Sequence, residues 1–188
     1  GKSTLLKMIT GSLQPDSGGA SIGASVKMGY FAQHAMEVLN GELTIFETLQ
    51  ADFPTATQGT LRTLAGCFGF PGDDVDKYVR VLSGGEKARL VMAHMLFDPP
   101  NFLVLDEPTN HLDVTTKDLL VETLSAFEGT MIFVSHDRRF LSALSNRVLE
   151  LTPEGPKVYG GGYSEYVIAS GHEAPGLRSA AEKKKAKS

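Results

Sequence analysis

Three scarcities in the sequence exclude whole classes of protein. Only one cysteine is present, Cys67, so no intrachain disulfide can form, which fits the reducing cytoplasm. No apolar run approaches the ~20 residues that a helix needs to cross a bilayer, so no membrane span is expected. The formal net charge is −4, which argues against a protein held on nucleic acid by bulk electrostatics. These features together indicate a cytoplasmic protein.

The two ends of the chain differ from its middle. The first residue is Gly1 rather than methionine, so we expect the natural chain to begin upstream, and the lack of a visible signal peptide decides nothing. Basic residues are concentrated at the other end, at Arg178, Lys183, Lys184, Lys185 and Lys187. We expect residues 171–188 to form a basic, solvated and disordered tail. Contact of its lysines with RNA phosphates stays open as an alternative.

What is present is the composition and patterning of one globular domain. The chain has 188 residues, of which 41% are hydrophobic and 21% charged, within the soluble range. Helical spacing of apolar residues predicts helices at residues 3–10, 83–97 and 115–127. Short apolar runs predict strands at residues 20–22, 26–31, 102–105 and 131–134, the last two buried, and a hairpin at residues 147–151 and 157–159. This alternation predicts an α/β fold with a mainly parallel sheet flanked by helices.

The segment at about residues 35–97 breaks the alternation of strand and helix. Its pattern is mainly helical and is interrupted at Pro54 and at residues 70–72. Ser83 and Glu86 then have the spacing of a capping box, which predicts the start of a helix that ends before Asp98. The segment is therefore predicted to be a small helical subdomain inserted into the α/β core.

The chain opens with the last residues of a phosphate-binding loop pattern, G-x-x-x-x-G-K-[ST]. In such a loop, backbone amides at a helix N-terminus bind phosphate, a lysine reaches the β- and γ-phosphates, and the next hydroxyl binds Mg²⁺. Four residues alone are a weak signal, because the first part of the pattern is not in this sequence. The candidate ATP-binding residues are Gly1, Lys2, Ser3 and Thr4.

Two adjacent carboxylates follow the predicted buried strand at residues 102–105. Asp106 and Glu107 should lie at the carboxyl edge of the sheet, where ligands bind in open α/β folds. Asp106 would hold a magnesium ion, and Glu107 would orient and deprotonate an attacking water. The alternative is an ordinary acidic pair that caps the turn before Pro108.

Three further groups are candidate site residues, and each is a weak signal unless the others are present. Two glycines at a helix start can expose amides to a phosphate, although a plain helix start has the same pattern. His136 follows a predicted buried strand and could contact a γ-phosphate or a water, although single histidines are more often structural. Gln33 also follows a strand and could contact magnesium or water, although it could equally be an ordinary surface residue.

The order and spacing of these groups resemble the ATP-binding cassette (ABC) family of P-loop NTPases. From about residue 1 to residue 167, the chain is similar to that family's Walker A end, Q-loop, signature, Walker B with catalytic glutamate, D-loop and switch histidine. The signature residues are Ser83, Gly84, Gly85 and Glu86, and the D-loop residues are Asn110, His111, Leu112 and Asp113. The resemblance implies one nucleotide-binding domain over residues 1–170, with ATP and Mg²⁺ as its ligands.

This resemblance implies a role for each candidate residue. Two such domains pair head to tail, with each ATP between the Walker A of one and the signature of the other. Glu107, His136 and Gln33 would be catalytic, and Ser3, Gln33 and Asp106 would bind the metal ion. Ser83 and Gly85 would serve the ATP of the neighbouring cassette. ATP binding would then close the pair and hydrolysis would open it.

Several details resemble the non-transporting, ribosome-associated branch called ABC-F. Glu86 replaces the glutamine usual in transporter signatures, and residues 106–113 have the ABC-F form of Walker B and D-loop. Residues 29–33, 135–141 and 159–166 also match that branch. This resemblance implies an ATPase that acts on the ribosome, with a second cassette in the same chain. The ATP-binding subunit of a membrane transporter and a nucleotide-binding scaffold without hydrolysis are the competing functions.

Two departures from the family pattern affect these expectations. The front of Walker A and the upstream aromatic residue that stacks on adenine are absent, so this fragment alone is expected to bind ATP poorly. The long basic linker typical after a first cassette is not evident, because residues 171–176 break the helical pattern. We therefore favour the second, C-terminal cassette.

Overall fold

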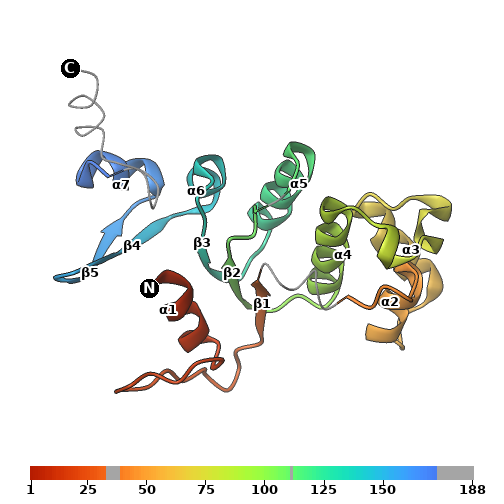
Figure 1. Cartoon of the computed structure of the whole chain (residues 1–188), viewed down its shortest axis with the longest axis horizontal. Coiled ribbons are helices and arrows are strands. Elements are labelled where there is room, and N and C mark those ends of the chain that lie inside the picture. Colours follow the sequence, from red (N-terminus) through yellow and green to blue (C-terminus); the bar gives the residue numbers. More distant parts are fainter. Residues whose placement is uncertain (33–38, 111, 173–188) are drawn as a thin grey trace.

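A parallel sheet lies at the centre of the molecule. The structure, a computed structural model, describes residues 1–32, 39–110 and 112–172. The sheet contains β1 (Met28–Ala32), β2 (Phe102–Asp106) and β3 (Thr130–Val134), parallel and in that order (Figure 1). β2 is the middle strand, and its residues 103–105 are fully buried. The predicted α/β architecture is confirmed, and parallel pairing brings the carboxyl ends of all three strands to one edge.

Three helices flank this sheet. They are α1 (Lys2–Ile9), α5 (Val114–Ser125) and α6 (Arg138–Leu144), and α1 lies on the opposite side of the strands from the other two (Figure 1). Each buries apolar side chains, such as Leu6 of α1, Leu120 of α5 and Phe140 of α6. α1 ends before Gly11, whose φ of 75° is the left-handed conformation that glycine adopts at helix ends. The predicted helices at residues 3–10 and 115–127 are confirmed.

The predicted helical subdomain is present at one end of the molecule (Figure 1). It contains α2 (Ile45–Asp52), α3 (Gln58–Cys67), the short 3₁₀ helices η2 (Gly72–Asp76) and η3 (Val79–Val81), and α4 (Gly84–Phe97). Thr44 and Ser83 each form a complete capping box, at the starts of α2 and α4. Buried residues of these helices and of the sheet form one continuous hydrophobic cluster. The helical segment is thus packed onto the α/β core.

A small antiparallel unit lies at the other end of the described chain. The strands β4 (Arg147–Thr152) and β5 (Gly155–Gly160) form the predicted hairpin, and α7 (Tyr163–Ser170) packs against it. Tyr163 and Tyr166 of α7 are the centre of a second, smaller hydrophobic cluster. Gly171, whose φ is 69°, is the C-cap of α7. Residues 173–188 of the predicted tail lie outside the described residues.

The structure corrects two expectations about secondary structure and adds one helix. Residues 20–22 do not form a strand, since no strand pairs with them among the described residues and Ile22 is exposed. β3 is present but only half-buried, because β2 is its only partner strand in the described chain, and Ile132 is 37% exposed. α6 was not predicted, because its 7 residues are too short to display a helical period. Asp137 starts it by accepting hydrogen bonds from the amides of Arg139 and Phe140.

The helices of the described residues are all too short or too polar to cross a membrane.

Candidate active site

The carboxyl end of β2 meets the N-terminus of α1. The Ser3 hydroxyl donates a hydrogen bond to Oδ1 of Asp106 over 3.0 Å, although the two residues are 103 positions apart in the sequence. Asp106 is the last residue of β2, whose buried residues fix its position. The structure thus brings together the hydroxyl and the carboxylate that the sequence analysis assigned to a metal ion.

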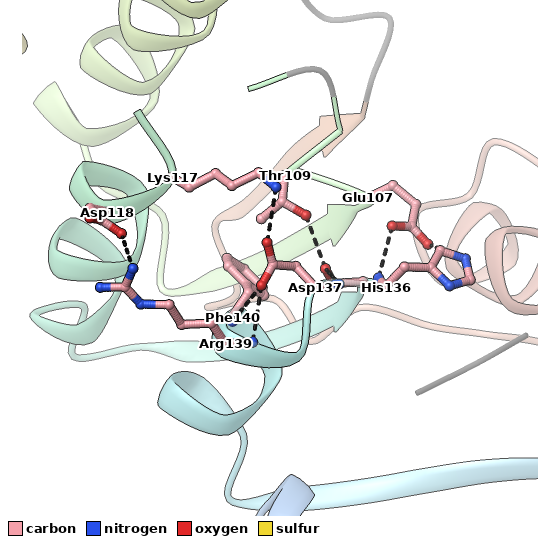
Figure 2. Close-up of polar contacts among 9 residues, drawn as sticks. Glu107, Thr109, Lys117, Asp118, His136, Asp137, Arg139 and Phe140 are labelled. Carbon is pink, nitrogen blue, oxygen red and sulfur yellow. Dashed lines mark hydrogen bonds and ion pairs between the residues drawn. The ribbon is translucent and has the colours of Figure 1, made fainter. Parts of the chain in front are cut away.

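Glu107 turns away from the strand in an unusual backbone conformation. Its φ of 51° is the only positive value for a non-glycine residue in the described part of the chain. Such conformations are strained and occur preferentially at functional sites. Its amide donates to the carbonyl of Val134 over 2.9 Å, which ties the turn to the end of β3. The side chain is thereby directed toward His136 (Figure 2).

His136 and Glu107 form two contacts. Nε2 of His136 lies 3.1 Å from Oε1 of Glu107, and the His136 amide donates to Oε2 over 3.2 Å. The His136 side chain is 55% exposed, whereas that of Glu107 is 15% exposed. The carboxylate is therefore held by the protein, while much of the imidazole faces solvent. Two of the three residues predicted to be catalytic, Glu107 and His136, are thus in contact.

A polar network that the sequence analysis missed holds the backbone beside His136. The buried hydroxyls of Thr109 and Ser135 lie 3.1 Å apart, and Ser135 Oγ accepts a hydrogen bond from the Asp137 amide (Figure 2). Lys117 Nζ lies 3.0 Å from Oδ2 of Asp137. Burial acts to raise the pKa of Asp137, but hydrogen bonds from the Phe140 amide and from Lys117 outweigh it, and the pKa lies below its ordinary value. The spacing of Asp137 before Phe140 was the N-cap signal that could have revealed part of this network.

The first turn of α1 presents the remaining Walker A residues. Gly1 is its N-cap, and Lys2, Ser3 and Thr4 are exposed. The first amides of a helix have no intrahelical acceptor, so they are available to an anion. Lys2 has no carboxylate partner among the described residues and lines a cavity of about 470 Å³ next to β3 and β4. Its predicted contact with phosphate stays a prediction.

The two signature glycines have different surroundings. A Cβ on Gly84 would meet no atom within 4 Å, so there is open space beside this exposed residue. A Cβ on Gly85 would lie 2.5 Å from Oδ2 of Asp113, which excludes any side chain unless Asp113 moves. Ser83 and Glu86 cap α4 reciprocally, and their hydrogen bonds lower the pKa of Glu86. Gly84 is thus the residue that leaves space for a ligand, whereas Gly85 is required by packing.

The D-loop connects the catalytic turn to α5. The amide of Asn110 donates to the Glu107 carbonyl over 3.2 Å, and Leu112 is buried. Asp113 caps α5 by accepting from the amide and the hydroxyl of Thr116 over 2.9 and 2.8 Å. These hydrogen bonds lower the pKa of Asp113.

The described residues therefore hold two groups of candidate site residues. One contains Ser3, Asp106, Glu107 and His136, and the other contains Ser83, Gly84, Gly85, Glu86 and Asp113. Gln33 and His111 lie outside the described residues. No cluster of three or more histidine, cysteine, aspartate or glutamate residues that could bind a metal occurs in the described ranges.

Comparison with known proteins agrees with this arrangement. The family model described as ABC transporter matches residues 1–110. The ATP-binding protein YbiT of Escherichia coli O157:H7 is 42% identical over 92% of this chain and 33% of its own length. ABC transporter F family member 5 of Arabidopsis thaliana is 41% identical over 89% of this chain and 24% of its own length. The chain thus spans a third or less of the length of these relatives.

A solved structure has the same fold. It is a metal-chelate type ABC transporter in an inward-facing conformation, with a TM-score of 0.65, 20% identity, and coverage of 85% of this chain and 68% of its own. At this identity the likeness concerns the fold alone. The match to the family model, the similarity to F family relatives and the site geometry lead to one assignment. The chain belongs to the family of ABC transporter ATPase domains, and its relatives are ABC-F type proteins.

Proposed function

We propose that this chain is the catalytic part of a cassette that binds ATP and hydrolyses it to ADP and phosphate. The observation that carries this proposal is the convergence of two pairs at one edge of the sheet. Ser3 and Asp106 lie 3.0 Å apart, and Glu107 contacts His136. Next to them the open N-terminus of α1 offers amides for phosphate. The domain would cover residues 1–170, since α7 ends at Ser170.

Each side chain has a role that follows from its contacts. Lys2 and the α1 amides would bind the phosphates, and the Glu107 carboxylate would accept a hydrogen bond and then a proton from the attacking water. His136 would hold Glu107 through its amide and present its exposed imidazole to the γ-phosphate. Positioning and electrostatics would supply most of the acceleration.

The Ser3 and Asp106 oxygens fit Mg²⁺. This ion prefers hard oxygen ligands and commonly binds through one carboxylate, a hydroxyl, waters and the phosphates of its nucleotide. When bound, Mg²⁺ would neutralise charge on the phosphates. Ser3 and Asp106 would orient one another for this task, because the hydroxyl already donates to the carboxylate. Gln33 is proposed as a further ligand on the strength of its place after β1.

We further propose that a second cassette, in the same full-length protein, completes each ATP site. Gly85 of the signature lies against Asp113, and the signature forms a group separate from that of Ser3 and His136, which suits a role toward a neighbouring domain. The much greater length of the relatives leaves room for such a domain. We favour the C-terminal position for this cassette, because residues 171–176 break the helical pattern.

The cellular role that we propose is ATP-gated action on the ribosome in the cytoplasm. Its support is the resemblance of Glu86 and of residues 106–113 to ABC-F proteins, together with the F family relatives. The second candidate is the ATP-binding subunit of a membrane transporter, which has the same core chemistry and the same fold as the solved transporter.

Sedimentation with ribosomes separates the two roles. The full-length protein carrying Glu107→Gln is pelleted with ribosomes in the presence and absence of ATP, next to the unsubstituted protein. ATP-dependent co-sedimentation of the variant is expected, because blocked hydrolysis keeps the closed form populated. No association, with ATPase activity intact in the unsubstituted protein, would remove the ribosomal role and turn the search to a membrane partner.

A further inference from the structure

Arg89 lies on α4, one turn beyond the signature, and reaches the D-loop through a single hydroxyl. Its Nη1 donates to Oγ1 of Thr116 over 3.4 Å. The same Oγ1 donates to Oδ2 of Asp113 over 2.8 Å, so one hydroxyl serves as acceptor and donor at once. Thr116 is fully buried. The bridging hydroxyl is therefore shielded from water, although Arg89 is half-buried and Asp113 is exposed.

The Arg89 side chain also contacts the segment that follows α3. The guanidinium carbon lies 5.4 Å from the centroid of the Phe70 ring, within the range of a cation–π contact. Nε is buried and has no hydrogen-bond partner among the described residues. A Cβ on Gly69 would lie 3.3 Å from Nε, so this glycine leaves the space that the side chain fills. Leaving the buried Nε unpaired is costly, so the contacts of Arg89 with Phe70 and Thr116 must offset that cost.

The signature and the D-loop also touch directly. Gly85 lies so close to Asp113 that the carboxylate occupies the space of a missing Cβ. Asp113 thus contacts the signature turn on one side and accepts from Thr116 on the other. Hydrogen bonds with Ser83 and with Thr116 are the main causes that lower the pKa values of Glu86 and Asp113, and the charge of Arg89 is a smaller further cause for both.

We propose that Arg89 is a positioning residue that couples the signature turn, residues 83–86, to the D-loop through Thr116 and Asp113. The two segments would then move as one unit toward the ATP of the neighbouring cassette. This inference rests on the proposed function, because it concerns how that second ATP site is completed. Arg89 does not itself need to touch nucleotide.

The test compares paired variants of the full-length protein. Thr116→Ser keeps the bridging hydroxyl and Thr116→Val removes it. Arg89→Met removes the charge while keeping a long side chain. Arg62→Met is the matched control, because the Arg62 guanidinium lies 5.3 Å from the Phe46 ring in the same subdomain but has no contact with the described residues of the D-loop. For each variant kcat, KM for ATP and the thermal unfolding midpoint are measured.

We expect Thr116→Val and Arg89→Met each to lower kcat about tenfold, as befits the loss of one hydrogen bond to a charged group. KM for ATP should change little, since Lys2 and Ser3 are untouched. Thr116→Ser should keep near-normal kcat, and the double variant should be no slower than either single one, because both break the same link. Arg62→Met should leave kcat unchanged. Lower unfolding midpoints with unchanged kcat, or an equal loss of kcat in Arg62→Met, would overturn the proposal.

Hydrogen exchange tests the coupling without using activity. In Thr116→Val, amide protection should fall together in the first turns of α4 and α5, relative to Thr116→Ser. Loss confined to α5 would overturn the coupling even if hydrolysis changed. Failure of the proposed function would give a different result from failure of the coupling. The unsubstituted protein would then hydrolyse ATP no faster than Glu107→Gln.

Discussion

At the scale of single residues, Glu107 combines strain with restraint. A φ of 51° is costly for a glutamate, and it persists because the amide is bonded to Val134 and the carboxylate to His136. The result is a carboxylate with a defined orientation at the edge of the sheet. A side chain that is fixed in advance loses less conformational entropy when it orients a water.

Replacement of Glu107 by glutamine should separate binding from hydrolysis. The amide keeps the size of the side chain and can still contact His136, but it cannot accept a proton. We expect turnover to fall by about 10²–10⁴, the usual contribution of a general base, with ATP affinity preserved. Single-turnover hydrolysis and equilibrium nucleotide binding by the full-length protein measure the two quantities. Unchanged turnover would contradict the general-base role.

Replacement of Lys2 by alanine should act on binding itself. Lys2 has no carboxylate partner in the described chain, so its loss removes a ligand contact rather than a structural ion pair. We expect ATP affinity to fall about 10–100-fold, which corresponds to the loss of a hydrogen bond to a charged group. Titration with a fluorescent nucleotide checks this. The exposed Lys7 of the same helix provides a control, and normal affinity in Lys2→Ala would refute the phosphate contact.

The two signature glycines should respond differently to alanine. In Gly85→Ala the new methyl group would lie 2.5 Å from Oδ2 of Asp113 and displace the α5 cap, so we expect a loss of about 1–3 kcal/mol in unfolding free energy. In Gly84→Ala the methyl group meets open space, and a change within about 0.5 kcal/mol is expected. Urea unfolding of both variants measures the difference. Equal destabilisation would show that the packing of Gly85 is unimportant.

At the scale of elements, one carboxylate connects the three elements of the C-terminal unit, β4, β5 and α7. Glu150 on β4 accepts hydrogen bonds from the hydroxyls of Tyr159 on β5 and Tyr166 on α7, over 3.0 and 2.9 Å. His172 Nδ1 lies 2.6 Å from the same side chain. Burial acts to raise the pKa of Glu150, but the bonds from Tyr166, His172 and Tyr159 outweigh it and hold the pKa below its ordinary value. Burial and Glu150 raise the pKa of Tyr166 to about 12.

This pKa shift predicts the acid sensitivity of the unit. A glutamate whose pKa is lowered by folding stabilises the folded state above its unfolded pKa of about 4.3 and loses that contribution as pH falls through the folded pKa. We therefore expect protection of the β4–β5 and α7 amides to decline below about pH 4.3. Glu150→Gln should lose about 1–3 kcal/mol at neutral pH and show less of this decline. Hydrogen exchange at several pH values tests both, and an unchanged acid profile in Glu150→Gln would contradict the assignment.

At the scale of the whole molecule, the sheet and the helical subdomain share one core. Phe31 of the sheet and Ile45 of α2 belong to the same buried cluster, as does Phe140 of α6. The signature, at the start of α4, is therefore connected by packing to β2, which carries Asp106 and Glu107. Arg89 adds a polar link to this apolar one.

The sequence by itself determined most of the elements and proposed the candidate site residues. Apolar runs predicted the strands that end at Asp106 and before His136, and Ser83 with Glu86 predicted the start of α4. These features depend on near neighbours in the chain, such as backbone caps and side-chain periods, so a local pattern contains them.

The tertiary structure alone decided which side chains meet. Ser3 contacts Asp106 across 103 positions, and Arg89 reaches Asp113 through Thr116. The backbone strain at Glu107, the half-exposure of β3 and the distinct surroundings of Gly84 and Gly85 were also absent from the local pattern. Each of these depends on the packing of segments that are distant in sequence. A single sequence records which residues are present, whereas distances between distant segments follow only from the folded arrangement.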